Sequence, residues 1–231
     1  MLHLVTPAQQ KKNKIFRPVY FNMGYTIPVG DFGAAPVLSK NVQENIRAGF
    51  SGTKPGYLFE FGTKIYFNNS SHKLRYGLDW AFISLMYNEL DWQLYAATKK
   101  GQVTNAMTAS VSSRLGPVIS YNITKKLVTD FHFQVAPVVE HSWFDYYSQA
   151  GGEEFYYDNK KPIKNFGIKT SAGIGIRWGV IGMAADYFHG SAFASYYYTN
   201  TATGEGISNN TQSIKEKIHS SSVQLKISLN L

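Results

Sequence analysis

The chain contains no cysteine, which excludes disulfide bonds and thiolate metal sites. It also lacks any run approaching the roughly 20 consecutive apolar residues that a membrane-spanning helix needs. Its 6 histidines show no spacing such as His-x-x-x-His, so the sequence predicts no metal site and no cofactor. What remains is a chain of 231 residues, enough for one domain, with 15% aromatic residues and a net charge of +8.

The C-terminal segment from Val223 to Leu231 alternates apolar and polar side chains without interruption. Side chains of a β-strand alternate between its two faces, so the odd-numbered residues form an apolar face and the even-numbered ones a polar face. Seven further segments fit the same template, and each can supply the about 9–11 residues that a tilted strand needs to cross a bilayer. The eight predicted strands are 16–29, 54–67, 74–88, 103–121, 127–144, 164–178, 180–198 and 218–231.

The connections between these strands alternate in length. The short connections are 68–73, 122–126 and Gly179, and the long ones are 30–53, 89–102, 145–163 and 199–217. Short turns at one end and long loops at the other are typical of outer-membrane barrels. The sequence therefore predicts an all-β protein: an eight-stranded antiparallel transmembrane up-and-down β-barrel, located in the outer membrane. Its barrel domain is residues 16–231, after an N-terminal tail of residues 1–15.

The tail allows two interpretations. Thr6-Pro7-Ala8 resembles the end of an export signal peptide cleaved after Ala8, although the preceding apolar segment is shorter than the usual 7–15 residues. The other interpretation is a plain disordered tail.

The large aromatic and aliphatic residues are expected to face outward, toward lipid, because small and charged residues fit the narrow interior of an eight-stranded barrel better. A soluble, lipocalin-like barrel with the two faces reversed stays open as an alternative. Aromatic residues near the strand ends are expected to form two girdles at the membrane interfaces. They are Phe16, Phe67, Tyr121 and Trp178 at the turn ends, and Tyr87, Trp92, Trp143 and Tyr196 at the loop ends.

The polar faces carry charges of both signs in nearly equal number. Buried charges must be paired, so these residues are predicted to form an ion-pair network that closes the lumen. The predicted network contains Glu60, Lys64, Arg75, Asp79, Arg114, Asp130, Glu140, Lys169, Arg177, Asp186 and Lys226.

The excess positive charge lies at the turn end and in the tail. This basic rim consists of Lys11, Lys12, Lys14, Arg17, Lys73, Lys125 and Lys126, without one acid among them. A concentrated positive field favours outer-membrane lipids, lipopolysaccharide included, or an acidic periplasmic or membrane protein partner. Because the excess lies on this one rim, nucleic acid is not a predicted partner.

Two segments resemble a known family. The ending Gly24-x-x-x-Pro28-x-Gly30-Asp31-Phe32 of the first strand is similar to the opening hairpin of small outer-membrane β-barrel proteins of Gram-negative envelopes, such as the OmpX, OmpW and PorT kinds. The strand 57–67, followed by Asn68-Asn69, is also typical of them. The chain departs from the family at its terminus, where Leu231 stands in place of the usual Phe.

One pair of residues raises the question of catalysis. By strand parity, His189 and Ser191 both face lipid, and the lipid A deacylase PagL is similar in carrying a His-x-Ser pair on its outer wall. The acid that would orient the histidine has no matched candidate beyond Glu205 and Glu216, and the family's Asn after the Ser is Ala192 here. The alternative interpretation is an interfacial His and Ser without catalysis.

The prediction is a non-enzymatic structural or interaction component of the envelope, such as a subunit of a secretion or assembly complex. The alternatives are a PagL-like lipid A acyl hydrolase and an OmpW-like channel for small solutes. The Tyr-rich segments 144–147 and 153–158 are expected to form either an adhesive external surface or a structured cap over the barrel mouth.

Overall fold

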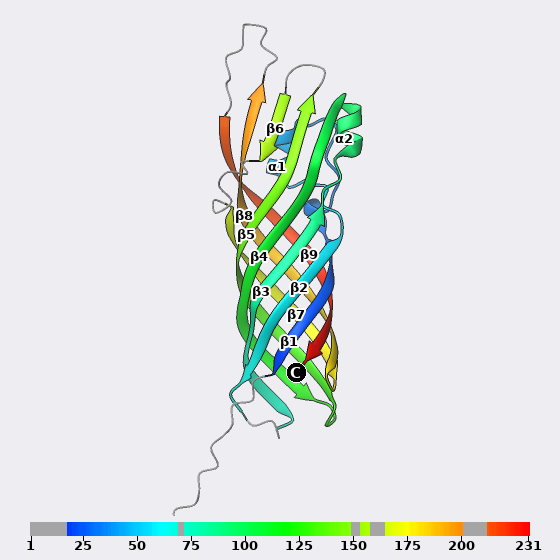
Figure 1. Ribbon diagram of the computed structural model, residues 1–231. Coiled ribbons are helices and arrows are strands. Elements are labelled where there is room, and N and C mark those ends of the chain that lie inside the picture. Colours follow the sequence, from blue (N-terminus) through cyan, green and yellow to red (C-terminus); the bar gives the residue numbers. More distant parts are fainter. Residues whose placement is uncertain (1–17, 69–71, 149–152, 158–164, 201–211) are drawn as a thin grey trace, which may run out of the picture.

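Figure 1 shows the computed structural model, which describes residues 18–68, 72–148, 153–157, 165–200 and 212–231. Eight long strands form a closed ring, and the predicted tail lies outside the described residues. The ring strands are β1 (Val19–Pro28), β2 (Gly56–Tyr66), β3 (Leu74–Glu89), β4 (Gly101–Asn122), β5 (Leu127–Ser148), β7 (Phe166–Trp178), β8 (Ile181–Asn200) and β9 (Gln212–Asn230).

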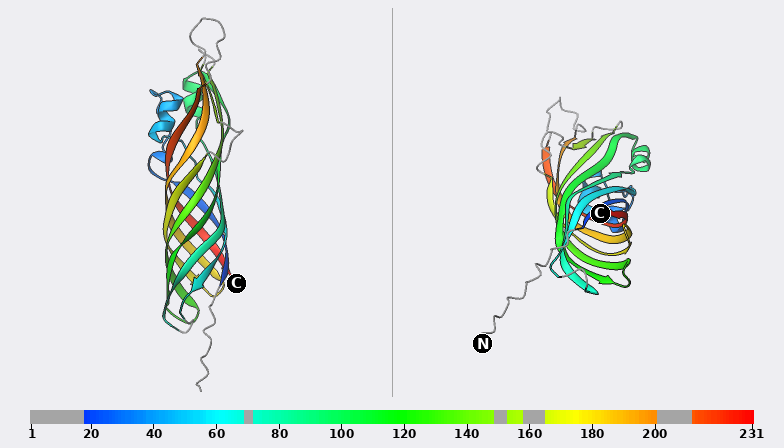
Figure 2. Two further views of the ribbon diagram at one scale, coloured as in Figure 1. Left: turned by 90° about the vertical axis from the view of Figure 1, so that its left-hand side faces the viewer. Right: turned by 60° about the horizontal axis from the view of Figure 1, so that its bottom comes forward.

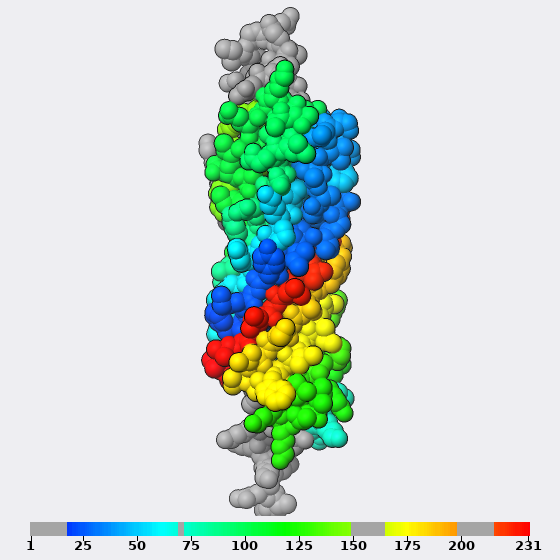
Figure 3. Space-filling view, turned by 90° about the vertical axis from the view of Figure 1, so that its right-hand side faces the viewer, coloured from blue at the N-terminus to red at the C-terminus, as the bar shows by residue number. Residues whose placement is uncertain are grey.

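Every ring strand pairs antiparallel with its neighbours, and the ring closes where the first strand meets the last. On this seam Met23 of β1 lies opposite Ile227 of β9 on one side and Phe59 of β2 on the other. In Figure 3, β9 in red runs diagonally between β1 in blue and the yellow to orange residues of β7 and β8. The prediction of an all-β, eight-stranded antiparallel up-and-down barrel is confirmed.

Four strands, β4, β5, β8 and β9, continue past the closed ring on the side of the long loops, here called the loop end. β4 and β5 have 22 residues each, whereas β1 has only 10 and its pairing with β9 stops at Pro28. A short strand, β6 (Glu153–Tyr157), pairs with both β5 and β8 and continues the position of β7. The predicted loop 145–163 thus contains a strand, and a curved sheet extends beyond the closed ring (Figures 1 and 2).

Two short helices in the predicted loops 30–53 and 89–102 cover the inner face of this extension. The helix α1 (Val42–Ala48) begins at a capping box in which Asn41 and Glu44 exchange side chain-to-backbone hydrogen bonds, and it ends at Gly49 with φ 88°. The helix α2 (Gln93–Thr98) follows Trp92. A 3-10 turn, η1 (Gly30–Phe32), follows β1. Within the described ranges, no helix is long and apolar enough to cross a membrane.

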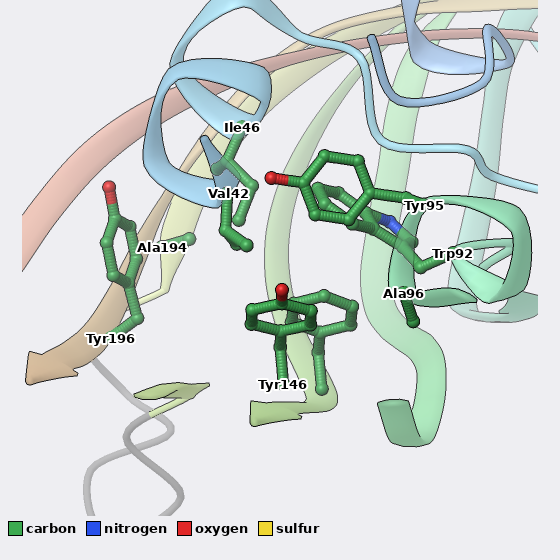
Figure 4. Packing of buried hydrophobic residues seen from close by; sticks show 9 residues of the cluster. Val42, Ile46, Trp92, Tyr95, Ala96, Tyr146, Ala194 and Tyr196 are labelled. Carbon is green, nitrogen blue, oxygen red and sulfur yellow. The ribbon is translucent and has the colours of Figure 1, made fainter. Parts of the chain in front are cut away.

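An aromatic core forms between these helices and the extended strands (Figure 4). The Trp92 ring lies 4.8 Å from the Phe144 ring, and the Tyr95 ring 5.8 Å from the Tyr146 ring, measured between centroids. The cluster consists of Val42, Ile46, Trp92, Tyr95, Ala96, Phe144, Tyr146, Ala194 and Tyr196. Of the two expectations for segment 144–147, the structure has the cap, because Phe144 and Tyr146 are buried in this core.

The assignment of Trp92 and Tyr196 to an outer girdle is wrong. Both side chains are buried in the aromatic core, because the strands continue past the ring and their inner face needs apolar partners there. The other described girdle residues lie outside: Phe67, Tyr87, Tyr121 and Trp178 are exposed, and Trp143 is half-buried against His141. Phe16 lies outside the described residues.

The outer face of the ring carries an apolar belt to which every ring strand contributes. Met183 is 68% exposed and Ile227 65%. A β-bulge in β3 between Ala81 and Ser84 turns both Phe82 and Ile83 outward. Representative members of the belt, in strand order, are Met23, Tyr57, Leu85, Leu115, Phe133, Ile174, Met183 and Ile227.

Candidate functional site

The interior of the ring is filled by charged side chains. All eleven residues of the predicted network lie on the inner face: ten are buried, and Glu140 is half-buried. The period of two puts them there, since each shares the parity of the polar face of its strand.

The first cluster surrounds Glu60 on β2. Arg114 Nη1 of β4 lies 3.0 Å from Glu60 Oε1, and Lys226 Nζ of β9 lies 2.7 Å from Glu60 Oε2. Lys226 also contacts Asp186 of β8, and Arg114 donates a hydrogen bond of 2.8 Å to Gln224. A fully buried carboxylate with two cationic partners fits the rule that buried charges must be paired.

The second cluster surrounds Asp130 on β5, nearer the turn end. Its carboxylate pairs with Lys64 of β2, and Arg177 Nη2 of β7 lies 3.6 Å from Oδ1. Ser120 donates a further hydrogen bond of 2.5 Å to the same carboxylate. Because β2 and β5 are not neighbours in the ring, the Lys64–Asp130 pair crosses the lumen.

A third pair closes the interior toward the loop end, where Lys169 of β7 meets Glu140 of β5. Phe188 of β8 lies between this pair and the first cluster. The Lys169 ammonium is 5.5 Å and the Arg114 guanidinium 4.3 Å from the centroid of its ring. The Phe188 side chain therefore contacts two cations by the face of its aromatic ring, which is a favourable arrangement for buried groups.

The two remaining predicted residues contact tyrosines. The Tyr20 hydroxyl donates a hydrogen bond of 2.7 Å to Asp79, and the Arg75 guanidinium lies 4.3 Å from the centroid of the Tyr66 ring. The aromatic rings thus supply interior contacts that the predicted network did not include.

The predicted network left out several residues whose side chains lie in the interior. His132 lies on the polar face of its strand, and its Nε2 is 3.1 Å from Asp186 Oδ1. Tyr20 and Phe188 also point inward, although aromatic residues were expected to face lipid. Tyr66 is buried on the face of Glu60 and Lys64, as the alternation of its strand predicts. Parity was a usable signal for Phe188 as well, since it is two residues from Asp186.

Little empty space remains in the interior. A cavity of about 40 Å³ lies beside Tyr20, Glu60, Asp130 and His132, and another of about 10 Å³ lies beside Met86. Spaces of this size hold water molecules rather than a sugar or a nucleotide.

The turn end carries an open hollow with a basic lining. Lys73, Lys125 and Lys126 are exposed around it, and Arg75 and Arg177 line its inner part. Asn122, Thr124 and apolar residues complete the lining, which includes no acid among the described residues. The other members of the predicted rim, Lys11, Lys12, Lys14 and Arg17, lie outside the described residues.

The histidine of the predicted His-x-Ser pair has a partner on another strand. His189 is exposed on the outer wall, and its Nδ1 lies 2.7 Å from Ser221 Oγ of β9, while Ser191 is half-buried two residues along β8. Glu216 accepts hydrogen bonds from Arg47 of α1. Glu205 lies outside the described residues. The contact that a nucleophile and its base require is therefore present between His189 and Ser221, without a described acid bonded to the histidine.

No protein-family profile matches the chain, and a search of curated proteins finds none with a similar sequence. Three features of the structure bear on function: the apolar belt, the paired interior and the basic hollow.

Proposed function

We propose that the chain is a non-enzymatic outer-membrane barrel with a closed lumen, acting as a structural or interaction component of a Gram-negative envelope. A subunit of a secretion or assembly complex would have these properties. The proposal depends above all on one observation: the outer face of the ring is apolar while its inner face holds buried ion pairs.

The belt supports a lipid environment. Water-soluble monomers rarely expose contiguous apolar patches larger than a few hundred Å². Here large apolar side chains are exposed on every strand of the ring, among them Tyr57 at 70% and Trp178 at 67%. Even the shortest ring strand has 10 residues, which meets the about 9–11 that a tilted spanning strand needs.

The interior supports a closed barrel rather than a solute pathway. Glu60, Asp130 and Asp186 each contact at least one cation, and aromatic rings occupy space between the clusters. An open aqueous channel leaves charges on its wall hydrated, whereas these are buried against one another.

Tryptophan quenching tests the membrane proposal directly. Trp80 is 41% exposed on the belt, while Trp92 is buried in the loop-end core. In single-tryptophan variants folded into vesicles, brominated acyl chains should quench Trp80 strongly and Trp92 weakly, because quenching requires contact with the chains. Equal quenching of both, or a protein that stays dispersed without detergent or lipid, would contradict the proposal.

Two other functions, a channel and a hydrolase, would give different results in two further assays. An OmpW-like channel would give steady conductance in planar bilayers, and a PagL-like hydrolase would remove one acyl chain from lipid A. The contact of His189 with Ser221 makes a Ser221→Ala variant the informative control for the second measurement. We expect neither conductance nor deacylation.

The basic hollow gives the proposed interaction component a surface for a partner. Five cations line it without an acid among the described residues, so an acidic segment of a periplasmic or membrane protein is the complementary ligand. The outer-membrane lipids, lipopolysaccharide included, are the second proposed class of partner, and they surround the belt.

A further inference from the structure

The outward face of β9 changes its chemistry along the strand. From Val223 to Leu231 the outward residues are apolar, and these nine residues match the about 9–11 that span a bilayer. Beyond them, toward the loop end, the outward residues are polar and then basic. They are Ser221, His219, Lys217 and Lys215, of which the last three are exposed.

The neighbouring strand completes a patch around these bases. On β8, Ser191 lies opposite His219 and Phe193 lies opposite Lys217. Phe193 is 42% exposed, and the Lys215 ammonium lies 4.5 Å from the centroid of its ring. An exposed aromatic ring with basic side chains beside it is typical of the level at which a barrel leaves the hydrocarbon layer.

No outward position of β7, β8 or β9 within the described residues carries an acid. Glu216 has the inward parity and bonds to Arg47. Two other elements that contact β9 carry acids: η1 has the exposed Asp31, and α1 has Glu44, which bonds to Asn41 in the capping box. The positive charge of Lys215 and Lys217 therefore has no carboxylate partner on its own face of these strands.

We propose that Lys215, Lys217 and His219 bind the phosphate group of an outer-leaflet lipid whose acyl chains lie along the belt below. This inference rests on the proposed function, because it requires that the belt faces lipid. The occupant follows from continuity: the same face of the same strand passes from apolar residues to cations at the level of the headgroups. His189, hydrogen-bonded to Ser221 one row nearer the belt, lies at the boundary between the two levels.

The test uses the full chain in detergent micelles and compares two probes, bisphosphorylated lipid A and the same lipid A without phosphate. Binding is measured by titration with native mass spectrometry. The parent should prefer the phosphorylated form. The variant Lys215→Gln/Lys217→Gln should bind it about 25-fold more weakly, since each lysine near a membrane surface contributes about fivefold.

The matched control is Lys54→Gln/Lys100→Gln, which removes the same charge from exposed positions outside β8 and β9 and should leave the preference unchanged. Equal binding of both probes by the parent, or equal loss in both variants, would overturn the inference. The inference would also be overturned if the Lys215→Gln/Lys217→Gln variant kept the lipid preference but no longer retained an acidic protein that the parent retains from native membranes. Quenching of Trp80 by brominated acyl chains in vesicles separates this failure from a failure of the membrane proposal.

Discussion

Lys226 bridges two carboxylates inside the ring, with its Nζ 2.7 Å from Glu60 and in contact with Asp186. The change Lys226→Met would leave these carboxylates close together with one fewer positive charge between them. Removing one partner of a buried ion pair costs about 3–5 kcal/mol of unfolding free energy. Urea unfolding of the vesicle-inserted protein, followed by tryptophan fluorescence, measures this change.

The control for this prediction is Lys73→Met, which removes the same charge from an exposed turn. Surface changes of this kind usually alter stability by less than about 0.5 kcal/mol. Similar losses for the two variants would mean that the interior pairs do not determine stability.

Parity along each strand was sufficient to predict which charges point inward, but it does not predict their partners. Lys64 pairs with Asp130 across the lumen, from a strand that is not its neighbour. Such a contact depends on the stagger and diameter of the closed ring, which no local pattern contains. The inward Phe188 was missed because residue type was given more weight than parity.

At the scale of the elements, the loop-end core depends on contacts between α2 and β5. Phe144→Ala would remove the phenyl group whose centroid lies 4.8 Å from that of the Trp92 side chain. Core Phe→Ala changes cost about 3–5 kcal/mol of unfolding free energy. Because the closed ring does not share this core, we expect faster hydrogen exchange and proteolysis in α1 and α2, with the ring strands still protected.

Leu94→Ala is the matched control, since Leu94 lies on α2 and its side chain is 70% exposed. It should leave the exchange of both helices close to that of the parent. Loss of protection throughout the ring in Phe144→Ala would show instead that cap and ring fold as one unit.

The eight ring strands were predictable because each follows the period of two, whereas the elements of the cap follow no long pattern. The helix α1 has only 7 residues, so its capping box at Asn41 and Glu44 was the signal available for it. Tyr196 shares the inward parity of Asp186 and was assigned to a girdle because its residue type was given more weight than its parity, whereas Trp92 lies in a predicted loop, where alternation assigns no face. Because β4, β5, β8 and β9 continue past the closed ring of strands, the side chains of Trp92 and Tyr196 lie in the interior.

At the scale of the whole molecule, closure of the ring and the segregation of charge follow from the same alternation of short turns and long loops. The turns converge at one end, so Lys73 and the pair Lys125 and Lys126 surround a single hollow although they come from different connections. A positive field from such a cluster extends over about 8 Å at physiological salt. The fold thus converts scattered lysines into one surface with a common ligand chemistry.

The last prediction tests this surface with the triple change Lys73→Gln, Lys125→Gln and Lys126→Gln. The variant should fold like the parent, because exposed turn charges contribute little to stability. It should lose the acidic protein that the parent retains from native membranes at low salt, and rising salt should weaken the parent's complex in the same way. The control removes three lysines of the loop end, with Lys54→Gln, Lys99→Gln and Lys100→Gln, and should retain the partner. If the triple variant at the turn end retains what the parent does at low salt, the hollow is solvated surface and the partner proposal is wrong.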